Sequence, residues 1–183
     1  MKIVVLDLDE TMGSFVQFSI FVDCILNYTN RQFDQHIFNA LLDLYPEFIR
    51  PNMIEILSYI LTKKQTGECK QVMIYTNNQG PRKWANQLIS FFESKINSKL
   101  FDRIIGAFKI NGRKIELCRS SHNKSHEDLV RCTKIPYNTQ ICFIDDAYYP
   151  EMVHENIYYI HIEPYRYDLD IMTLVERFIN SEY

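Results

Sequence analysis

The chain of 183 residues is long enough to bury the core of one domain, and its 46% hydrophobic and 23% charged residues are ordinary for a globular protein. Its formal net charge of −3 at pH 7 excludes the strong basic excess typical of nucleic-acid-binding domains, although not a local basic patch. The apolar runs are too short to cross a bilayer, and the start lacks the features of a signal peptide. We therefore expect a cytoplasmic or nuclear protein that is not bound to a membrane.

The cysteines support this expectation. Their number is odd, their spacing is wide, and no C-x-x-C pair occurs, a pattern that favours unpaired thiols in a reducing compartment. The five are Cys24, Cys69, Cys118, Cys132 and Cys142.

Short apolar, β-branched runs are typical of buried strands. In chain order they occupy residues 2–6, 71–75, 140–144 and 157–162. Apolar residues with helical spacing lie between and after them, and predict helices. These sets are Met53, Leu57, Ile60 and Leu61; Trp84, Leu88, Phe91 and Phe92; and Met172, Val175, Phe178 and Ile179. Strands that alternate with helices predict an α/β fold with a mainly parallel sheet, whose ligand site lies beyond the carboxyl ends of the strands.

Residues 14–49 interrupt this alternation, and their apolar residues are spaced for two helices of a small insert. The sets are Phe15, Phe18, Val22 and Ile25, followed by Phe33, Ile37, Leu41 and Leu44. The next helix is expected to begin near Arg50-Pro51, because proline suits a first helical turn. With no linker or repeat, residues 1–183 are expected to form a single domain.

Pairs of carboxylates follow two of the predicted strands. Asp7 and Asp9 come after the first and point the same way in an extended chain, while Asp145 and Asp146 come after the third. Neighbouring carboxylates repel each other, and a hard cation such as Mg²⁺ relieves that repulsion. The alternative for either pair alone is a solvated acidic turn.

Two further polar features fall in the same kind of position. The T-N-N-Q-G turn at residues 76–80 follows a strand and can cradle an anion, or it simply caps the next helix. Lys124 stands where a helix is predicted to start, 21 residues before Asp145, and can neutralise carboxylate and phosphate charge. The alternative is a solvated lysine, with Lys114 and Lys134 as other candidates for the same role.

Together these pieces resemble the haloacid dehalogenase superfamily of phosphohydrolases. The match, in family order, is Asp7-x-Asp9-x-Thr11, Thr76, Lys124 and Asp145-Asp146. It implies a three-layer, Rossmann-like fold with a minimal helical cap at residues 14–49. Within the superfamily the chain most resembles the compact RNA-polymerase C-terminal-domain, or NLI-interacting-factor-like, phosphatases. The supporting features are the D-L-D-E-T spelling, Arg50-Pro51, the I-D-D ending and the strand at 157–162.

The resemblance implies a mechanism. Asp7 would attack phosphorus to form an aspartyl-phosphate, and Asp9 would act as general acid and then general base. Mg²⁺ would lie between Asp7, the backbone carbonyl of Asp9 and an acid of the last pair, Asp146 first and Asp145 beside it.

The resemblance also assigns the residues that meet the phosphate. Thr76 and the Asn77 backbone would hold a phosphoryl oxygen, with Thr11 and Asn78 also at the substrate. Lys124 would offset the charge of the nucleophile and the phosphoryl group.

The substrate is the least determined part. A minimal cap leaves the cleft open, which favours a phosphorylated macromolecule, first phosphoserine or phosphothreonine in a protein. The helical insert replaces the small β insert of the peptide phosphatases, and the T-N-N-Q-G turn resembles the T-N-Q turn of polynucleotide 3′-phosphatases and histidinol phosphatases. A polynucleotide 3′-phosphatase and a small-molecule phosphatase are therefore alternatives, as is a non-catalytic phospho-ligand-binding module.

A zinc site formed by Cys118, His122, His126 and Cys132 is a less favoured interpretation. Their spacing lacks the tight C-x-x-C pair, or the two histidines on one helix, of well-attested zinc sites.

Overall fold

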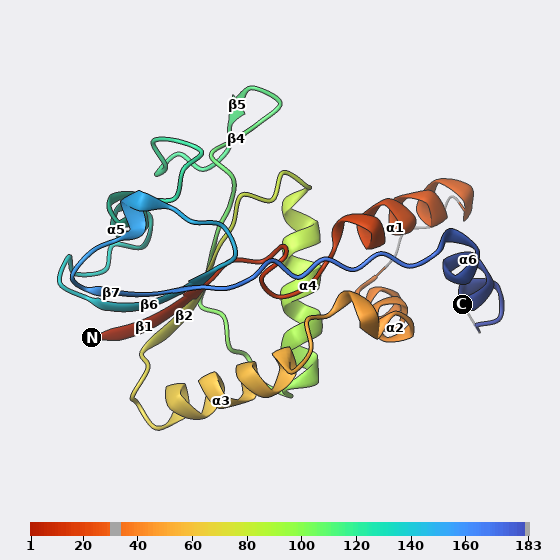
Figure 1. Cartoon of the computed structure of the whole chain (residues 1–183), viewed down its shortest axis with the longest axis horizontal. Coiled ribbons are helices and arrows are strands. Elements are labelled where there is room, and N and C mark those ends of the chain that lie inside the picture. The colour runs from red at the N-terminus through yellow and green to blue at the C-terminus, as the bar shows by residue number, and fades with distance from the viewer. Residues whose placement is uncertain (30–33, 182–183) are drawn as a thin grey trace.

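The computed structural model describes residues 1–29 and 34–181 and is built around one parallel sheet (Figure 1). Its five strands lie in the order β3-β2-β1-β6-β7. They are β1 (Lys2–Leu6), β2 (Gln71–Tyr75), β3 (Arg103–Ile105), β6 (Gln140–Asp145) and β7 (Ile157–His161). The predicted α/β class with a parallel sheet is confirmed, and the architecture is compatible with a Rossmann-like fold.

The central position of β1 determines where the strand ends meet. Leu6 pairs with Ile74 of β2 on one side and with Ile144 of β6 on the other. The chain therefore leaves β1 toward one side of the sheet and later returns on the opposite side, which creates a crevice at the carboxyl ends of these strands.

Each face of the sheet buries its own apolar cluster, because successive side chains of a strand point to opposite faces. Leu6 packs with Leu57 of α3 (Met53–Gln65) and Leu88 of α4 (Arg82–Lys95). Val5 instead packs with Leu129 of α5 (His126–Thr133). The helices thus lie in layers on the two faces of the sheet.

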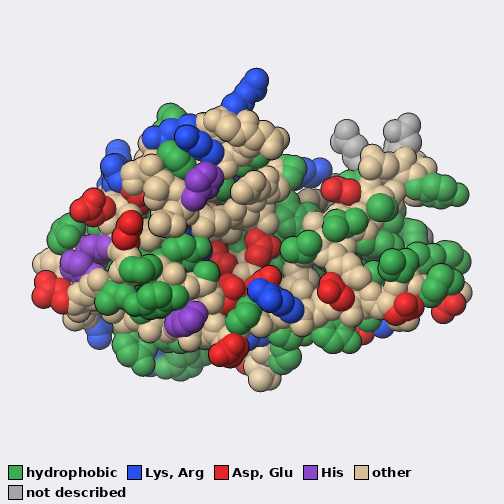
Figure 2. Space-filling view, turned by 45° about the horizontal axis from the view of Figure 1, so that its top comes forward, with side chains coloured by type: hydrophobic (Ala, Val, Ile, Leu, Met, Phe, Trp, Pro, Cys, Tyr) green, Lys and Arg blue, Asp and Glu red, His purple; other side chains and the backbone are tan. Residues whose placement is uncertain are grey.

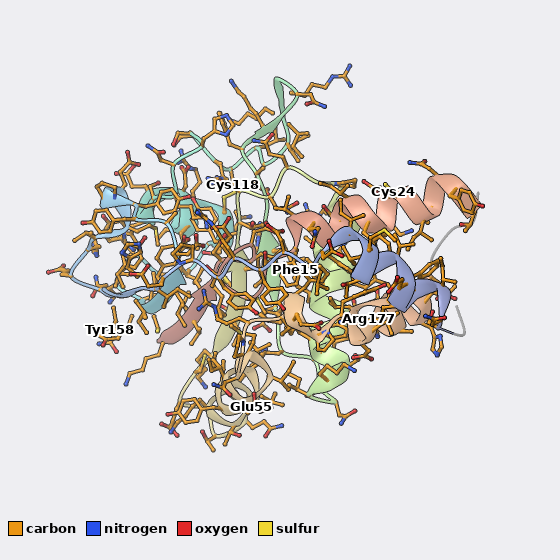
Figure 3. The ribbon with its side chains drawn as sticks, turned by 45° about the vertical axis from the view of Figure 1, so that its right-hand side comes forward. Phe15, Cys24, Glu55, Cys118, Tyr158 and Arg177 are labelled. Atoms are coloured by element: carbon orange, nitrogen blue, oxygen red, sulfur yellow. A yellow bond between two sulfur atoms is a disulfide. The ribbon has the colours of Figure 1, made fainter. Side chains whose placement is uncertain are left out.

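The insert at residues 14–49 is helical, as predicted. It consists of α1 (Val16–Thr29), α2 (Gln35–Leu44) and the short 3₁₀ helix η1 (Pro46–Phe48), while Phe33 lies outside the described residues. Phe18 is fully buried, with ring centroids 5.8 Å from Phe38 and 5.8 Å from Trp84 of α4. Phe15 lies between the sheet and the insert helices (Figure 3), so aromatic packing joins the insert to the sheet domain.

The C-terminal helix α6 (Ile171–Ile179) packs on this insert and not on the sheet (Figures 1 and 3). The Tyr45 hydroxyl donates a 2.7 Å hydrogen bond to the carbonyl of Leu174, and Arg177 pairs with Glu47 at 2.9 Å. Leu174 is the buried side chain of α6.

The helix predicted from the spacing of Met172, Val175, Phe178 and Ile179 is present as α6, but most of these four side chains are not buried. Met172 is 62% exposed and Ile179 is 71% exposed, while Phe178 does pack against the core. The helix contacts the insert through Leu174, Phe178 and the Arg177–Glu47 ion pair, and this packing leaves Met172 and Ile179 exposed.

Several boundaries and short elements differ from the sequence-based expectation. The helix expected at Arg50-Pro51 begins at Met53, and Asn52, with φ of 62°, precedes it. The elements that were not predicted are β3, the antiparallel hairpin of β4 (Lys109–Ile110) and β5 (Arg113–Lys114), and the 3₁₀ helix η2 (Pro150–Met152). Within the described residues, no helix is long and apolar enough to cross a membrane.

The expectation of five unpaired thiols is wrong. Cys118 and Cys132 form a disulfide that ties the segment after β5 to α5, whereas Cys24, Cys69 and Cys142 are free. Figure 3 shows Cys24 on the insert helix α1, away from Cys118. The inference of a reducing compartment rested on unpaired thiols and therefore loses that support.

Reduction of this disulfide should destabilise the protein. The two cysteines are 14 residues apart, and closing a loop of about 15 residues stabilises a fold by about 3 kcal/mol. In a domain of this size that corresponds to a fall of about 5–10 °C in Tm on adding dithiothreitol. Thermal unfolding of wild type and of Cys118→Ser/Cys132→Ser, each with and without reductant, measures it. The double variant should be insensitive to reductant, and an equally insensitive wild type would contradict the cross-link.

Candidate functional site

The carboxyl ends of β1, β2 and β6 bring together the aspartates and the threonine turn that the sequence marked as chemically active. Asp7 directly follows β1 and Thr76 directly follows β2. Asp145 is the last residue of β6, and Asp146 comes next. Figure 2 shows acidic side chains gathered near the middle of one face of the molecule.

Lys124 is the centre of this group. Its ammonium lies 2.5 Å from Asp7 Oδ1 and 2.6 Å from Asp145 Oδ2, and the side chain is only 1% exposed. The following residue, Ser125, is the N-cap of α5 and accepts from the Asp128 amide, so the start of the helix positions the lysine. The other two candidates for this role are both exposed: Lys114 lies on β5, and Lys134 lies at the end of α5.

Three carboxylates form a candidate cation site. Ligand oxygens of Asp7, Asp145 and Asp146 lie within 4.8 Å of one another. Asp145 is engaged by Lys124 and by the amide of Ala147, whereas Asp146 accepts a 2.9 Å hydrogen bond from the Thr11 hydroxyl through Oδ1 only. This all-oxygen donor set fits Mg²⁺, with Asp7 and Asp146 as the carboxylates best able to bind it.

Thr11 therefore has a different part from the one expected. Thr11 is fully buried. Its hydroxyl donates a hydrogen bond to the carboxylate of Asp146 and accepts one from the backbone amide of Asp146. Thr11 positions the acidic pair and is not exposed to a substrate.

Asp9 lies near Asp7 and is hydrogen-bonded to the turn that follows β2. The side-chain amide of Asn78 donates a 2.8 Å hydrogen bond to Asp9 Oδ2. Burial raises the pKa of Asp9 to about 6, with Asp7 adding to the shift and the Asn78 hydrogen bond opposing it. A carboxyl with such a pKa suits a group that gives up and takes back a proton near neutral pH.

Burial also raises the pKa of Asp7, and it raises that of Asp145 to about 6, while in both cases Lys124 opposes the shift. The two carboxylates in turn raise the pKa of Lys124 above its ordinary value despite the desolvation of its ammonium. Lys124 is therefore a fixed positive charge at neutral pH.

The turn after β2 forms one wall of a cleft. The Thr76 hydroxyl accepts from the Asn78 amide at 3.0 Å, and the Asn77 side chain donates to the Tyr149 hydroxyl at 2.9 Å. Oδ1 of Asn77 is buried without a hydrogen-bond partner among the described residues. The cleft has a volume of about 340 Å³ and is lined by Asp7, Asp9, Phe15, Val16, Ser19, Thr76, Asn77, Asn78, Gln79 and Trp84.

Two arginines that support the site were not identified as functional from sequence. Arg119 is 1% exposed and donates to the carbonyls of Thr76, Gly106 and His122, at 3.2, 2.8 and 2.9 Å. It therefore ties the turn of Thr76 to the loop that leads to Lys124. No local sequence signal marks such a residue, because its partners are backbone carbonyls of other segments.

Arg50 supports the first turn in the same way. Its guanidinium donates to the carbonyls of Thr11, Glu10 and Glu163, each at 2.7 Å. Glu10 has a φ of 57°, a left-handed conformation that non-glycine residues rarely adopt. Arg50 thus holds a strained turn that aims Asp7 and Asp9, and the Arg50-Pro51 pair was a sequence signal for it.

The zinc interpretation is not supported. The sulfurs of Cys118 and Cys132 are bonded to each other, His122 lies against the ring of Phe108, and His126 packs on His154. Within residues 1–29 and 34–181, the three aspartates are the only potential metal-binding group of three or more acidic, cysteine or histidine residues.

Comparisons with protein-family models, with curated proteins and with solved structures found no match to this chain.

Replacing Asp9 by asparagine should stabilise the metal-free protein. The pKa of Asp9 is about 6 in the fold against an ordinary 3.8, so the folded state binds this proton more tightly than the unfolded chain does. The ionised group therefore destabilises the fold fully above pH 6, and this effect fades as the pH falls toward 4. Asp9→Asn should gain about 1–3 kcal/mol at pH 7.5.

Urea unfolding in EDTA at pH 7.5 and pH 4.5 measures this gain. The asparagine can still accept from Asn78, so the packing is preserved. An unchanged or lower stability of Asp9→Asn at pH 7.5, or a gain that does not shrink at pH 4.5, would contradict the raised pKa.

Proposed function

We propose that this chain is a magnesium-dependent phosphomonoester hydrolase of the haloacid dehalogenase type that acts through an aspartyl-phosphate. The observation that carries the proposal is the buried ion-pair group, in which the ammonium of Lys124 contacts both Asp7 and Asp145. A third carboxylate, that of Asp146, has an oxygen within 4.8 Å of oxygens of these two aspartates. Phosphoryl transfer depends on such positioning and neutralisation of charge.

The proposed reaction assigns each step to a residue. A carboxylate oxygen of Asp7 attacks phosphorus while the ester P–O bond breaks, and Asp9 gives its proton to the leaving alkoxide. Asp9 then takes a proton from water, which attacks phosphorus, and the P–O bond to Asp7 breaks to release inorganic phosphate. Both aspartates return to their starting states.

The remaining groups hold the phosphoryl oxygens and balance their charge. Mg²⁺, held by Asp7 and Asp146 with the Asp9 carbonyl as a further ligand, would supply Lewis-acid stabilisation of the phosphoryl oxygens. Thr76 and Asn77 line the cleft beside Asp7 and are suited to donate hydrogen bonds there. Lys124 neutralises part of the charge that Asp7 and the phosphoryl group bring together.

We further propose that the substrate is phosphoserine or phosphothreonine in a protein. The insert contributes Phe15, Val16 and Ser19 to one wall of the cleft, and Val16 is 62% exposed. Such an insert borders the cleft without enclosing a small metabolite. A polynucleotide 3′-phosphate and a small phosphomonoester remain the alternative substrates.

Asp7→Asn should abolish hydrolysis of an aryl phosphate in the presence of Mg²⁺, because a carboxamide is not a useful nucleophile toward phosphorus. Excess EDTA should abolish wild-type turnover as well, and added Mg²⁺ should restore it. Release of inorganic phosphate and a circular-dichroism check of the fold are the measurements. Near wild-type turnover by Asp7→Asn would refute the nucleophile, and full activity in EDTA would refute the cation.

Asp9→Asn should slow a phosphoserine peptide more than an aryl phosphate. A serine alkoxide needs a proton to leave, whereas a phenolate leaves with little help, and general acid catalysis is typically worth about 10²–10⁴-fold. The kcat values of both proteins on both substrates give the comparison. Equal losses would show that Asp9 is not the proton donor.

The rival class is a phospho-ligand-binding module without catalysis. It predicts that phosphopeptides bind wild type and Asp7→Asn equally and are never turned over. Single-turnover assays with protein in excess over a radiolabelled phosphopeptide distinguish the two classes.

A further inference from the structure

A basic hairpin stands apart from the otherwise acidic character of the chain. The strands β4 and β5 carry Lys109, Arg113 and Lys114, all exposed, and residues 108–115 include no acidic residue. Figure 1 shows this hairpin projecting from the rest of the molecule, and Figure 2 shows basic side chains gathered at the corresponding edge.

The pairing of the hairpin places like charges opposite each other. Lys109 is the direct partner of Lys114, and Ile110 is the partner of Arg113. The ammonium groups of both lysines lie over the ring of Phe108, 5.0 and 5.1 Å from its centroid. Like charges directly opposite in a strand pair are destabilising, so this arrangement is unfavourable for the hairpin alone.

None of the three cations has an ion-pair partner in the part of the chain that the structure describes. The ion pairs of residues 1–29 and 34–181 do not include Lys109, Arg113 or Lys114. The one acidic residue close by in sequence, Glu116, is directed inward, where it accepts from the Gly106 amide. The hairpin therefore presents an uncompensated positive charge to solvent.

The hairpin has a tight turn at its tip and a backbone hydrogen bond at its base. Asn111 and Gly112 form a two-residue turn with φ of 48° and 77°, the conformation that matches the twist of paired strands. At the base, the Ile115 amide donates to the Phe108 carbonyl at 2.9 Å. A preorganised surface loses little entropy when it binds.

The base of the hairpin is also fixed to the candidate site. Arg119 donates both to Gly106, which precedes the hairpin, and to Thr76, which lines the cleft. The same arginine donates to His122, two residues before Lys124. Arg119 thus links the base of the hairpin both to the turn that lines the cleft and to the loop that leads to Lys124.

We propose that the β4–β5 hairpin is a docking arm for an acidic stretch of the phosphorylated protein substrate. The proposal rests on the phosphatase function proposed above and adds a preference within its substrate class. Lys109, Arg113 and Lys114 contact the acidic side chains of the substrate.

The local surface fits a peptide better than a nucleic acid. Ile115 is 47% exposed and Leu117 is 78% exposed beside the cations, so apolar as well as acidic side chains of a partner have a complement there. A nucleic acid carries a phosphate at every nucleotide, and its phosphates next to the scissile one would be repelled by Asp7 and Asp9, which line the cleft. A peptide concentrates its acidic residues at the arm.

The test compares two phosphoserine peptides that differ only in an acidic stretch, one with aspartates and the other with asparagines at the same positions. Wild type should show about tenfold higher kcat/KM for the acidic peptide, since three exposed ion pairs together are worth about that factor. Lys109→Ala/Arg113→Ala/Lys114→Ala should remove this preference, and 0.5 M NaCl should weaken it in wild type because salt screens exposed charges. Turnover of an aryl phosphate should be unchanged.

Two further variants distinguish docking on the hairpin from a general loss of positive charge and from unfolding of the hairpin. Lys2→Ala/Lys63→Ala/Lys70→Ala removes the same charge at exposed or partly exposed positions on β1, on α3 and in the α3–β2 loop, and should keep the preference. Lys114→Glu places an opposite charge facing Lys109, which stabilises the pairing while it weakens docking. Loss of preference in Lys114→Glu therefore cannot come from unfolding of the hairpin.

Binding to Asp7→Asn, followed by fluorescence anisotropy of the same labelled peptides, makes the result independent of turnover. Tighter binding of the acidic peptide that the hairpin substitutions abolish supports the arm even if neither peptide is hydrolysed, in which case the proposed function alone fails. Equal affinity and equal kcat/KM for both peptides would overturn the arm. A 3′-phosphorylated oligonucleotide that outcompetes the acidic peptide and loses most from the hairpin substitutions would overturn it too.

Discussion

The buried ammonium of Lys124 organises the carboxyl edge of the sheet. An ammonium that is 1% exposed is stable only with charged partners, and Asp7 and Asp145 provide them from β1 and β6. The pairing therefore joins a residue near the start of the chain to two from its last third. When all are ionised, three carboxylates (Asp7, Asp145 and Asp146) against one ammonium leave an excess of two negative charges, which is the electrostatic requirement for a divalent cation.

The buried Arg119 and the partly buried Arg50 extend the same principle to the backbone. Arg50 and Arg119 direct their guanidinium groups at main-chain carbonyls, not at carboxylates. Carbonyl groups do not titrate, so these contacts hold the turns around Asp7 and Thr76 in place over the whole pH range in which the aspartates change charge. The catalytic geometry proposed here is thereby separated from the protonation of the groups that would use it.

Much of the fold could be predicted because the central strands of the sheet are largely buried. The runs at residues 2–6 and 71–75 match β1 and β2 in full, since an unbroken apolar run is what a central parallel strand requires. The order of the strands brought Asp7, Thr76 and Asp145 to one edge, as the rule for parallel sheets implies. Lys124 was identified from its position before a predicted helix. Its contacts with Asp7 and Asp145 depend on the tertiary structure and could not be read from the sequence.

The parts that could not be predicted depend on contacts between distant segments. The Asn111-Gly112 turn is a strong hairpin signal, but only two paired residues flank it on each side, too few for an alternating pattern. Cys118 and Cys132 come together because the loop after β5 folds back on α5, which spacing alone does not reveal. Arg119 has no local sequence pattern, because its position depends on the carbonyls of Thr76 and Gly106 in other segments as well as on that of His122 in its own loop.

The docking of α6 on the insert has a consequence for how the chain matures during synthesis. The insert helix α1 is hydrogen-bonded to the segment before α6, with Gln17 donating to the Leu169 carbonyl and accepting from its amide. Near the end of the insert, Tyr45 is hydrogen-bonded to Leu174 and Glu47 forms an ion pair with Arg177, so both contacts need α6. A nascent chain on the ribosome can therefore assemble the sheet strands one after another while the insert still lacks its cover. The insert that supplies Phe15 and Val16 to the wall of the cleft is therefore fully packed only once residues 169–177 have been synthesised, about 150 residues after that wall itself.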